Sequence, residues 1–297
     1  MSMEINPNML VRGTAADGQV MFFSLDSTQL VEEARRKHNL SPLSTVVLGR
    51  LLTAAALAGQ ELKGDKDVLT MILKGSGPAG TVLVTANSKS QVKGYIDNTN
   101  LETKSREDGH FDVAWAVGPE EGTLTVIRDL GLREPYVGRV ELISGEIAED
   151  IAYYYAVSQQ TPSVVSLGVL IDTDGSVKHA GGFMLQVLPN TPEETIAALE
   201  QLVGGFPPVT FLLEEGFSAA ELMDLLLNRL GFEITTQTAA EYHCDCSKDR
   251  MERKLMTIGR ADLQSIVDDD QEQVELVCNF CNTAYSFTKD EIREMIK

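Results

Sequence analysis

The sequence predicts an α+β fold that consists of a sheet-rich core domain with packed helices, a helical linker and a small C-terminal domain. Three observations support this prediction. Strand-like runs in the first 189 residues follow one another in hairpins, which argues against a doubly wound parallel sheet. Residues 190–240 carry amphipathic helical patterns joined by loops that contain glycine and proline. All four cysteines of the chain lie between residues 244 and 281.

The predicted core domain spans residues 1–189. We expect a helix that begins at Ser41-Pro42 and a second helix over residues 145–159. Between these helices, six strand-like runs are separated by turns: LTMILKG, TVLVTA, QVKGYI, DVAWAV, TLTVI and VGRVELI. Two further strands are expected after the second helix, and they complete a domain built mainly from hairpins.

The predicted linker spans residues 190–240. Capping boxes at Thr191–Glu194 and Ser218–Glu221 each open a short helix, and Pro207-Pro208 separates the two helices. Each helix has one acidic face and one apolar face, and helices this short need a surface to pack on. The apolar positions are Ile196, Leu199, Val203, Leu222, Met223, Leu226 and Leu230.

Bulk composition excludes several classes of protein. The 297 residues are 43% hydrophobic and 23% charged, which is typical of a globular protein. A formal charge of −19 disfavours nucleic acid as a partner, because an acidic surface repels phosphates. No uncharged apolar run is long enough to predict a membrane span, and residues 46–59 are expected to be a buried helix. The N-terminus lacks a secretory pattern, so we expect a reducing cytoplasmic location.

The C-terminal domain, residues 241–297, is predicted to bind one zinc ion through Cys244, Cys246, Cys278 and Cys281. A C-x-C pair and a C-x-x-C pair together supply the four thiolates of a tetrahedral zinc site. A hairpin is expected to present the C-x-x-C pair, and so small a domain needs a metal to fold. The alternatives are four unrelated buried cysteines, or His243 in place of one ligand.

The cysteine spacing also bears on whether the zinc is structural or part of a redox switch. Zinc keeps all four sulfurs deprotonated and therefore reactive toward oxidants. Bridges Cys244–Cys246 and Cys278–Cys281 would close very small loops, so they would stabilise the fold little and suit a reversible bond. Loss of the zinc would remove roughly 10–16 kcal/mol of folding free energy. A redox switch is the favoured interpretation, with a purely structural site as the alternative.

Other motifs give no indication of an active site, so an enzyme is not expected. The run KGSGPAG contains G-x-G-x-x-G at Gly75, Gly77 and Gly80, but a strand rather than a helix follows it. It is interpreted as a hairpin turn. The run DTDGS lacks the downstream glutamate of a calcium loop, and the histidines belong to no recognisable catalytic motif.

Several segments together resemble the heat shock protein 33 family of redox-regulated holdase chaperones. The segments are HCDCS, VCNFCNTAYSF, ILKGSGPAG, GTLTVIRDLGLREPY, GRVELISGEIAEDIAYYYAVSQQTPSVVSLGVLID and AGGFMLQVLP. The likeness covers nearly the whole chain. Small departures occur in SQQTPS, where a glutamate is usual, and in GYIDNTN, which lacks the usual proline.

This resemblance implies a mechanism. The reduced, zinc-loaded protein has little chaperone activity, and oxidation forms the disulfides Cys244–Cys246 and Cys278–Cys281 with release of zinc. The C-terminal domain then unfolds, the linker undocks, and its apolar residues bind unfolded client proteins without ATP. The resemblance further implies that oxidised forms can be homodimers and that clients pass to ATP-driven foldase chaperones.

Two other classes of function stay open from the sequence alone. One is an interaction module in which a permanent zinc ribbon docks a protein or RNA, although 13 acidic and 8 basic side chains in residues 241–297 disfavour RNA. The other is an unrecognised enzyme in the first 190 residues that is regulated by zinc.

Overall fold

The computed structural model describes residues 8–269 and 272–296. The chain divides after Tyr242 into two compact units, and residues 190–242 belong to the same unit as residues 8–189.

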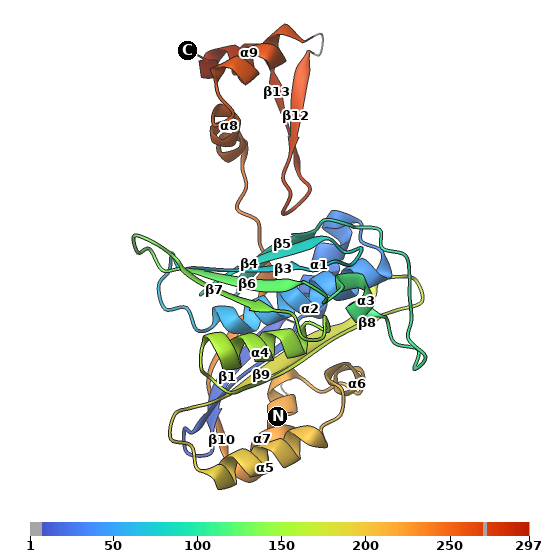
Figure 1. The fold of residues 1–297 in the computed structure, drawn as a ribbon, viewed down its shortest axis with the longest axis vertical. Coiled ribbons are helices and arrows are strands. Elements are labelled where there is room, and N and C mark those ends of the chain that lie inside the picture. The colour runs from blue at the N-terminus through green and yellow to red at the C-terminus, as the bar shows by residue number, and fades with distance from the viewer. Residues whose placement is uncertain (1–7, 270–271, 297) are drawn as a thin grey trace. The chain divides into compact units, whose positions relative to one another are not determined.

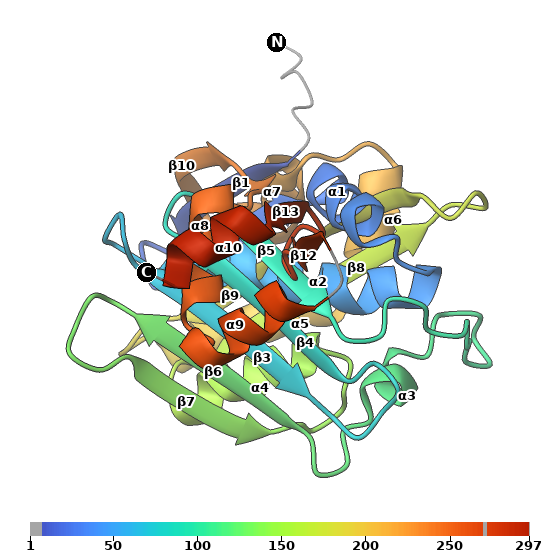
Figure 2. The same ribbon diagram turned by 90° about the horizontal axis from the view of Figure 1, so that it is seen from above.

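The first unit contains two sheets that are antiparallel apart from one short parallel pair (Figure 1). The five-stranded sheet has the order β10(Phe232–Ala239)-β1(Met9–Ala15)-β2(Val20–Asp26)-β9(Val177–Val187)-β8(Ser163–Ile171). The six-stranded sheet has the order β11(Glu241–Tyr242)-β5(Gln91–Ile96)-β4(Thr81–Asn87)-β3(Val68–Lys74)-β6(Thr123–Asp129)-β7(Tyr136–Glu141). Figure 2 shows β4, β3, β6 and β7 side by side. The predicted α+β class is confirmed, and neighbouring strands are mostly joined as hairpins.

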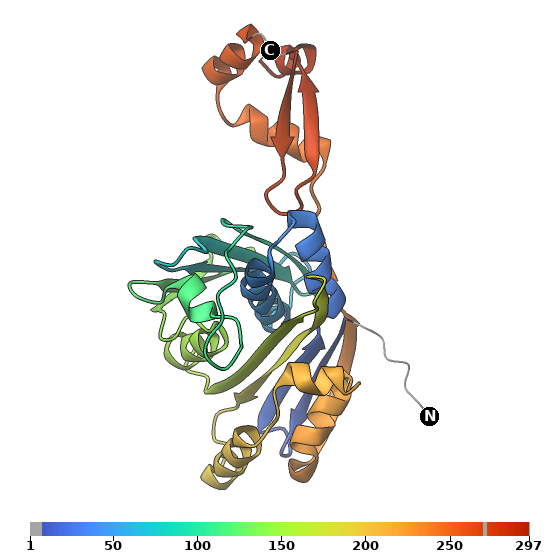
Figure 3. The same cartoon turned by 90° about the vertical axis from the view of Figure 1, so that its right-hand side faces the viewer.

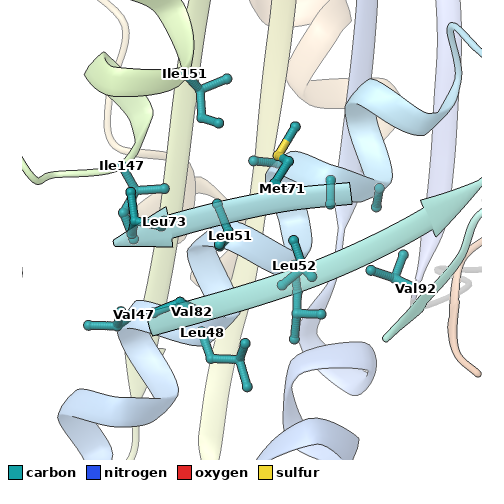
Figure 4. Close-up of a cluster of buried hydrophobic side chains, with 14 of the residues drawn as sticks. Val47, Leu48, Leu51, Leu52, Met71, Leu73, Val82, Val92, Ile147 and Ile151 are labelled. Atoms are coloured by element: carbon teal, nitrogen blue, oxygen red, sulfur yellow. The ribbon is translucent and has the colours of Figure 1, made fainter. Parts of the chain in front are cut away.

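Helix α2 (Pro42–Gly59) lies between the two sheets and forms the centre of the core. Its side chains Leu48, Leu51 and Leu52 are fully buried and meet side chains of β3 and β4 (Figure 4). The helix is long and apolar enough to cross a membrane, but 89% of it is buried inside the fold. The predicted buried helix is therefore confirmed, and its apolar sequence is accounted for by contact with a sheet on each side. The helices α1 (Thr28–His38) and α4 (Ala148–Ser158) pack beside it.

The predicted linker packs on the opposite face of the five-stranded sheet (Figure 3). It forms α5 (Glu193–Gly204), α6 (Val209–Glu214), α7 (Ala219–Leu227) and a 3₁₀ turn over Asn228–Leu230, followed by β10. Two of these elements were not predicted. Pro208 ends the gap after α5 and occupies the N-cap position of α6, directly before its first residue, Val209. Strand β10 pairs with β1, more than two hundred residues away in sequence.

Two local predictions were wrong. Thr191 does not cap α5, because its hydroxyl donates to backbone carbonyls at Gln19 and Leu188, and the helix begins after Pro192. The run DVAWAV is not a strand. It forms α3 (Val113–Val117), whose N-terminus is capped by the Asp112 carboxylate.

The glycine-rich run is a hairpin turn, as expected. Lys74 at the end of β3 pairs with Thr81 at the start of β4. A Cβ on Gly75 would lie 1.9 Å from the Val117 carbonyl oxygen, and one on Gly77 would lie 2.4 Å from that of Ala116. Gly75 and Gly77 are therefore required by the close approach of the loop to α3. The strand β4 follows this turn, so the run does not open a helix whose N-terminus could bind a phosphate.

The buried carboxylate of Asp150 organises the turn before α4. It accepts hydrogen bonds from the backbone N–H groups of Ile143, Ser144 and Ile147 at 2.8–3.1 Å. Ile147 has φ +72°, a conformation that costs free energy in a β-branched residue. The three hydrogen bonds are what hold the chain there.

Asp150→Ala is expected to destabilise the first unit by about 3 kcal/mol or more, because charged hydrogen bonds are lost and donors are left unpaired. Glu149→Ala, an exposed neighbour, is the control and should change stability by less than about 0.5 kcal/mol. Denaturant unfolding followed by far-UV circular dichroism measures both. Equal stability of the two variants would contradict the role given to Asp150.

In the second unit, residues 243–297, the described residues 243–269 and 272–296 form a hairpin and three short helices. The elements are α8 (Lys248–Met256), α9 (Arg260–Asp268), β12 (Gln273–Val277), β13 (Ala284–Thr288) and α10 (Lys289–Ile296). Its buried cluster consists of Met251, Leu255, Leu263, Val267, Cys278, Cys281, Phe287 and Ile292. Cysteine side chains are thus part of the small apolar core rather than attached to its surface.

Candidate metal centre

The C-x-x-C pair sits on the turn between β12 and β13, as the sequence predicted. Val277 pairs with Ala284, and the Cys278 N–H donates to the Thr283 carbonyl at 3.0 Å. The N–H groups of Cys281 and Asn282 turn back to the Cys278 carbonyl, and Asn282 adopts the left-handed conformation that such a turn needs. The turn therefore holds both sulfurs on the same side of the hairpin.

The C-x-C pair comes from the segment that leads into α8. The segment is fixed at its end by Ser247, whose hydroxyl caps the helix by accepting the Arg250 N–H. Cys244 and Cys246 are half-buried, whereas Cys278 and Cys281 are buried. Both sulfurs face the hairpin, because Cys244 Sγ contacts Cys278 Sγ and Cys246 Sγ contacts Cys281 Sγ.

The four sulfur atoms all lie within 4.8 Å of one another. Between the two pairs, 3.2 Å separates Cys246 Sγ from Cys281 Sγ, and 3.8 Å separates Cys244 Sγ from Cys278 Sγ. Four sulfurs at about 2.3 Å from one metal ion would lie about 3.8 Å apart. The donor set therefore fits a tetrahedral metal ion. His243 is not a member of this group.

Two hydroxyl groups lie against the sulfurs. Tyr285 Oη is 3.1 Å from Cys246 Sγ, and Thr283 Oγ1 is 3.2 Å from Cys281 Sγ. The hydrogen bond with Cys246 raises the pKa of the Tyr285 hydroxyl to about 12. Sequence reasoning missed both residues. The available signal was their position, since Thr283 lies two residues and Tyr285 four residues after Cys281, the last cysteine of the hairpin.

The thiols differ in how readily they lose a proton. Burial raises the pKa of Cys244 to about 12 and also raises the pKa of Cys246. Burial acts in the same direction on Cys281, but hydrogen bonds from the Thr283 hydroxyl and backbone N–H outweigh it and lower the pKa to about 7. A cation that binds here must displace protons from thiols that would otherwise keep them at neutral pH.

Metal affinity of the reduced protein is therefore expected to fall with pH. Cys244 and Cys246 each lose one proton on binding, so affinity should drop by at least about 100-fold per pH unit between pH 8 and pH 7. Cys281 becomes protonated only below about pH 7, where the dependence should steepen. Competition with a chelator at pH 6, 7 and 8 measures the slope. An affinity that is independent of pH would show that the metal does not replace these protons.

The apolar linker residues singled out from the sequence lie elsewhere, in the first unit. Leu199, Leu222, Met223 and Leu226 are buried, and Val203 and Leu230 are partly buried against them. Ile196 is half-buried and lies outside the cluster that these side chains form. The cluster also contains side chains of the sheet, among them Val20, Phe22, Phe183 and Leu185.

Comparison with known proteins identifies the family. The family model described as "Hsp33 protein" matches residues 8–288. The chain belongs to the Hsp33 family. A "33 kDa chaperonin" of Agathobacter rectalis is 46% identical over 96% of this chain and 98% of its own length. Another, from Clostridioides difficile, is 45% identical over 97% of this chain and 98% of its own length.

The fold of a solved structure also matches this chain over nearly its whole length. The 33 kDa chaperonin of Thermotoga maritima, described as a heat shock protein 33 homologue, superimposes with a TM-score of 0.90. It is 37% identical, and the match covers 98% of each chain. The family resemblance inferred from the cysteine motif and the core segments is thus confirmed over both units.

Proposed function

We propose that this chain is a redox-regulated holdase chaperone, inactive when reduced and metal-bound and activated by oxidation. Membership of a family whose relatives are named chaperonins supports the chaperone part. The observation that carries the redox part is the group of four sulfurs within 4.8 Å, built into the core of a small unit.

The proposed metal is one zinc ion held by Cys244, Cys246, Cys278 and Cys281. A closed set of four sulfurs suits a structural zinc site, because zinc accepts tetrahedral thiolate ligands and leaves no open position for a substrate. When bound, zinc supplies charge that keeps the thiolates deprotonated. The chain itself supplies the hairpin, the extended segment and the two hydroxyl groups that orient the sulfurs.

Oxidation of the thiolates is proposed to release the metal and form Cys244–Cys246 and Cys278–Cys281. In the folded unit all four sulfurs lie within 4.8 Å of one another, so proximity alone does not select the local pairing. We propose that opening of the unit selects it. Once it has opened, residues two or three apart stay close while distant ones separate, because loop closure costs least over short loops. Local disulfides follow from unfolding and also prevent the metal from returning.

The proposed client-binding surface is the apolar side of the predicted linker, with Ile196, Leu199, Val203, Leu222, Met223, Leu226 and Leu230 as candidates. In the reduced state most of these side chains pack on the five-stranded sheet. Undocking would expose both the helical stripe and the sheet face beneath it, a large apolar patch of the kind that binds unfolded chains. The chain's charge of −19 would help to keep such complexes dissolved.

The same proposal places the protein in a reducing cytoplasm, without ATP, enzymatic activity, nucleic acid or membrane as part of its action. Unfolded proteins are the clients. A homodimer of the oxidised form and transfer of clients to ATP-driven foldases complete the cycle.

Light scattering of a heat-denatured client tests the proposal. The peroxide-treated protein should suppress aggregation at equimolar ratio, and the reduced metal-loaded protein should not. Thiol counting and a metal indicator follow the switch in the same samples. If two disulfides form and the metal leaves while the client still aggregates, the chaperone assignment to the oxidised state is wrong.

A further inference from the structure

The hydroxyl of Tyr285 contacts one of the four sulfurs from β13. Its oxygen lies 3.1 Å from Cys246 Sγ, and that sulfur in turn lies 3.2 Å from Cys281 Sγ. The Tyr285 side chain is half-buried, so its ring is partly held by the surrounding fold. The contact joins the C-x-C segment to the strand that follows the C-x-x-C turn.

The direction of this hydrogen bond is fixed once the sulfur binds a metal. A thiolate has no proton to give, so the Tyr285 hydroxyl must donate to Cys246. A donor on a metal-bound thiolate fixes its orientation and draws charge from the sulfur. A sulfur with less charge available is a weaker nucleophile toward an oxidant.

The sulfur of Cys281 has different hydrogen-bonding partners from that of Cys246. The Thr283 hydroxyl and the Thr283 backbone N–H both act on Cys281. Loss of the Thr283 hydroxyl would leave the backbone donor in place. For Cys246, the described residues provide one contact to the sulfur besides those of the other thiols, and it comes from the Tyr285 hydroxyl. The two sulfurs should therefore respond unequally to removal of their hydroxyl partners.

We propose that Tyr285 is a positioning residue that sets the oxidant threshold of the switch by restraining the Cys246 sulfur. This inference rests on the proposed redox function. With hydrogen peroxide as oxidant, a thiolate attacks one peroxide oxygen, the O–O bond breaks, and the products are a sulfenic acid and, after protonation, water. A second thiolate attacks the sulfenic sulfur, the S–S bond forms, and the S–O bond breaks to release a second water. Two thiolates, one peroxide and two protons thus give one disulfide and two waters.

The hydroxyl of Tyr285 is not consumed in these steps. Its donation to Cys246 slows either step in which that sulfur is the nucleophile, because charge on the sulfur is partly neutralised. The same bond helps to hold the sulfur on the metal. Removal of one hydroxyl should therefore change both metal affinity and the rate of oxidation.

The test compares Tyr285→Phe with the full-length wild-type chain, reduced and loaded with zinc. Release of zinc under hydrogen peroxide is followed with a metal indicator, and cysteine oxidation is followed residue by residue with mass spectrometry. We expect release about 10-fold faster and zinc affinity about 10–100-fold weaker, as is typical when a partner of a metal ligand is lost. Thr283→Val should have a smaller effect, and Tyr153→Phe in α4 should have none.

Replacement of Tyr285 by 3-fluorotyrosine tests the opposite change, a stronger hydrogen bond to Cys246. The fluorine on the ring makes the hydroxyl a stronger hydrogen-bond donor. At pH 7 zinc release should then be slower than in the wild type, and circular dichroism confirms that each zinc-loaded variant is folded. Release rates and zinc affinities within twofold of the wild type for both changes would overturn the role of Tyr285. Wild-type protein that keeps its zinc in peroxide would instead overturn the proposed function itself.

Discussion

Removal of the metal from the reduced protein is expected to unfold residues 243–297 while the first unit stays folded. Of the eight buried cluster residues described in this unit, two are Cys278 and Cys281. The remaining apolar side chains give a core too small to offset the entropy of a chain of this length. A structural zinc site contributes roughly 10–16 kcal/mol at neutral pH, more than the whole stability of a typical domain of this size.

Hydrogen exchange with mass spectrometry measures this outcome segment by segment. After a chelator has removed the metal, amides of β12, β13 and α8–α10 should exchange at the rate of an unfolded chain, whereas those of α2, β3 and β4 stay protected. Cys278→Ser should show the same loss without a chelator. The matched control is the exposed neighbour Asn279→Ser, which should keep its protection. Slow exchange in residues 243–297 without metal would mean that the apolar cluster alone suffices.

The metal centre could be predicted from the sequence to a large extent because its signal is local. Two cysteine pairs in a chain without other cysteines define the ligand set, and the spacing of the C-x-x-C pair predicts its turn. The Ser218–Glu221 capping box is likewise local, and the structure shows both of its hydrogen bonds. The contact of Tyr285 with Cys246 depends on how two separate segments meet, so spacing alone does not show which sulfur it contacts, whereas Thr283 lies only two residues after its partner Cys281.

The errors in the fold arose where tertiary contacts override local patterns. Strand β10 carries Phe232 and Ile234 in alternation, but its partner β1 is distant in sequence, and strand formation depends on such pairing. The Thr191 hydroxyl is taken by carbonyls of another segment, so it is not available as a cap. In α3, a short apolar run of five residues fits a strand or a helix equally, and the Asp112 cap favours the helix.

Loosening the contact between α7 and the five-stranded sheet is expected to activate the chaperone without an oxidant. Leu222 is fully buried in the cluster that joins α5–α7 to the sheet. Leu222→Ala removes its contacts and leaves a cavity, which costs about 2–5 kcal/mol. Short helices depend on the surface they pack on, so much of this lost free energy should weaken the docking of α5–α7 on the sheet. The stability of the other core, which is built around α2, should change less.

Leu225→Ala, three residues along the same helix, is the matched control. Its side chain is 45% exposed, so the change should cost less than about 0.5 kcal/mol. Reduced Leu222→Ala with its full metal content should suppress aggregation of a heat-denatured client, and reduced Leu225→Ala should behave as the wild type. Since the four cysteines are untouched, activity in Leu222→Ala would separate exposure of the helical surface from the redox step that we propose as its cause. A destabilised Leu222→Ala protein that stays inactive until oxidised would place client binding on another surface.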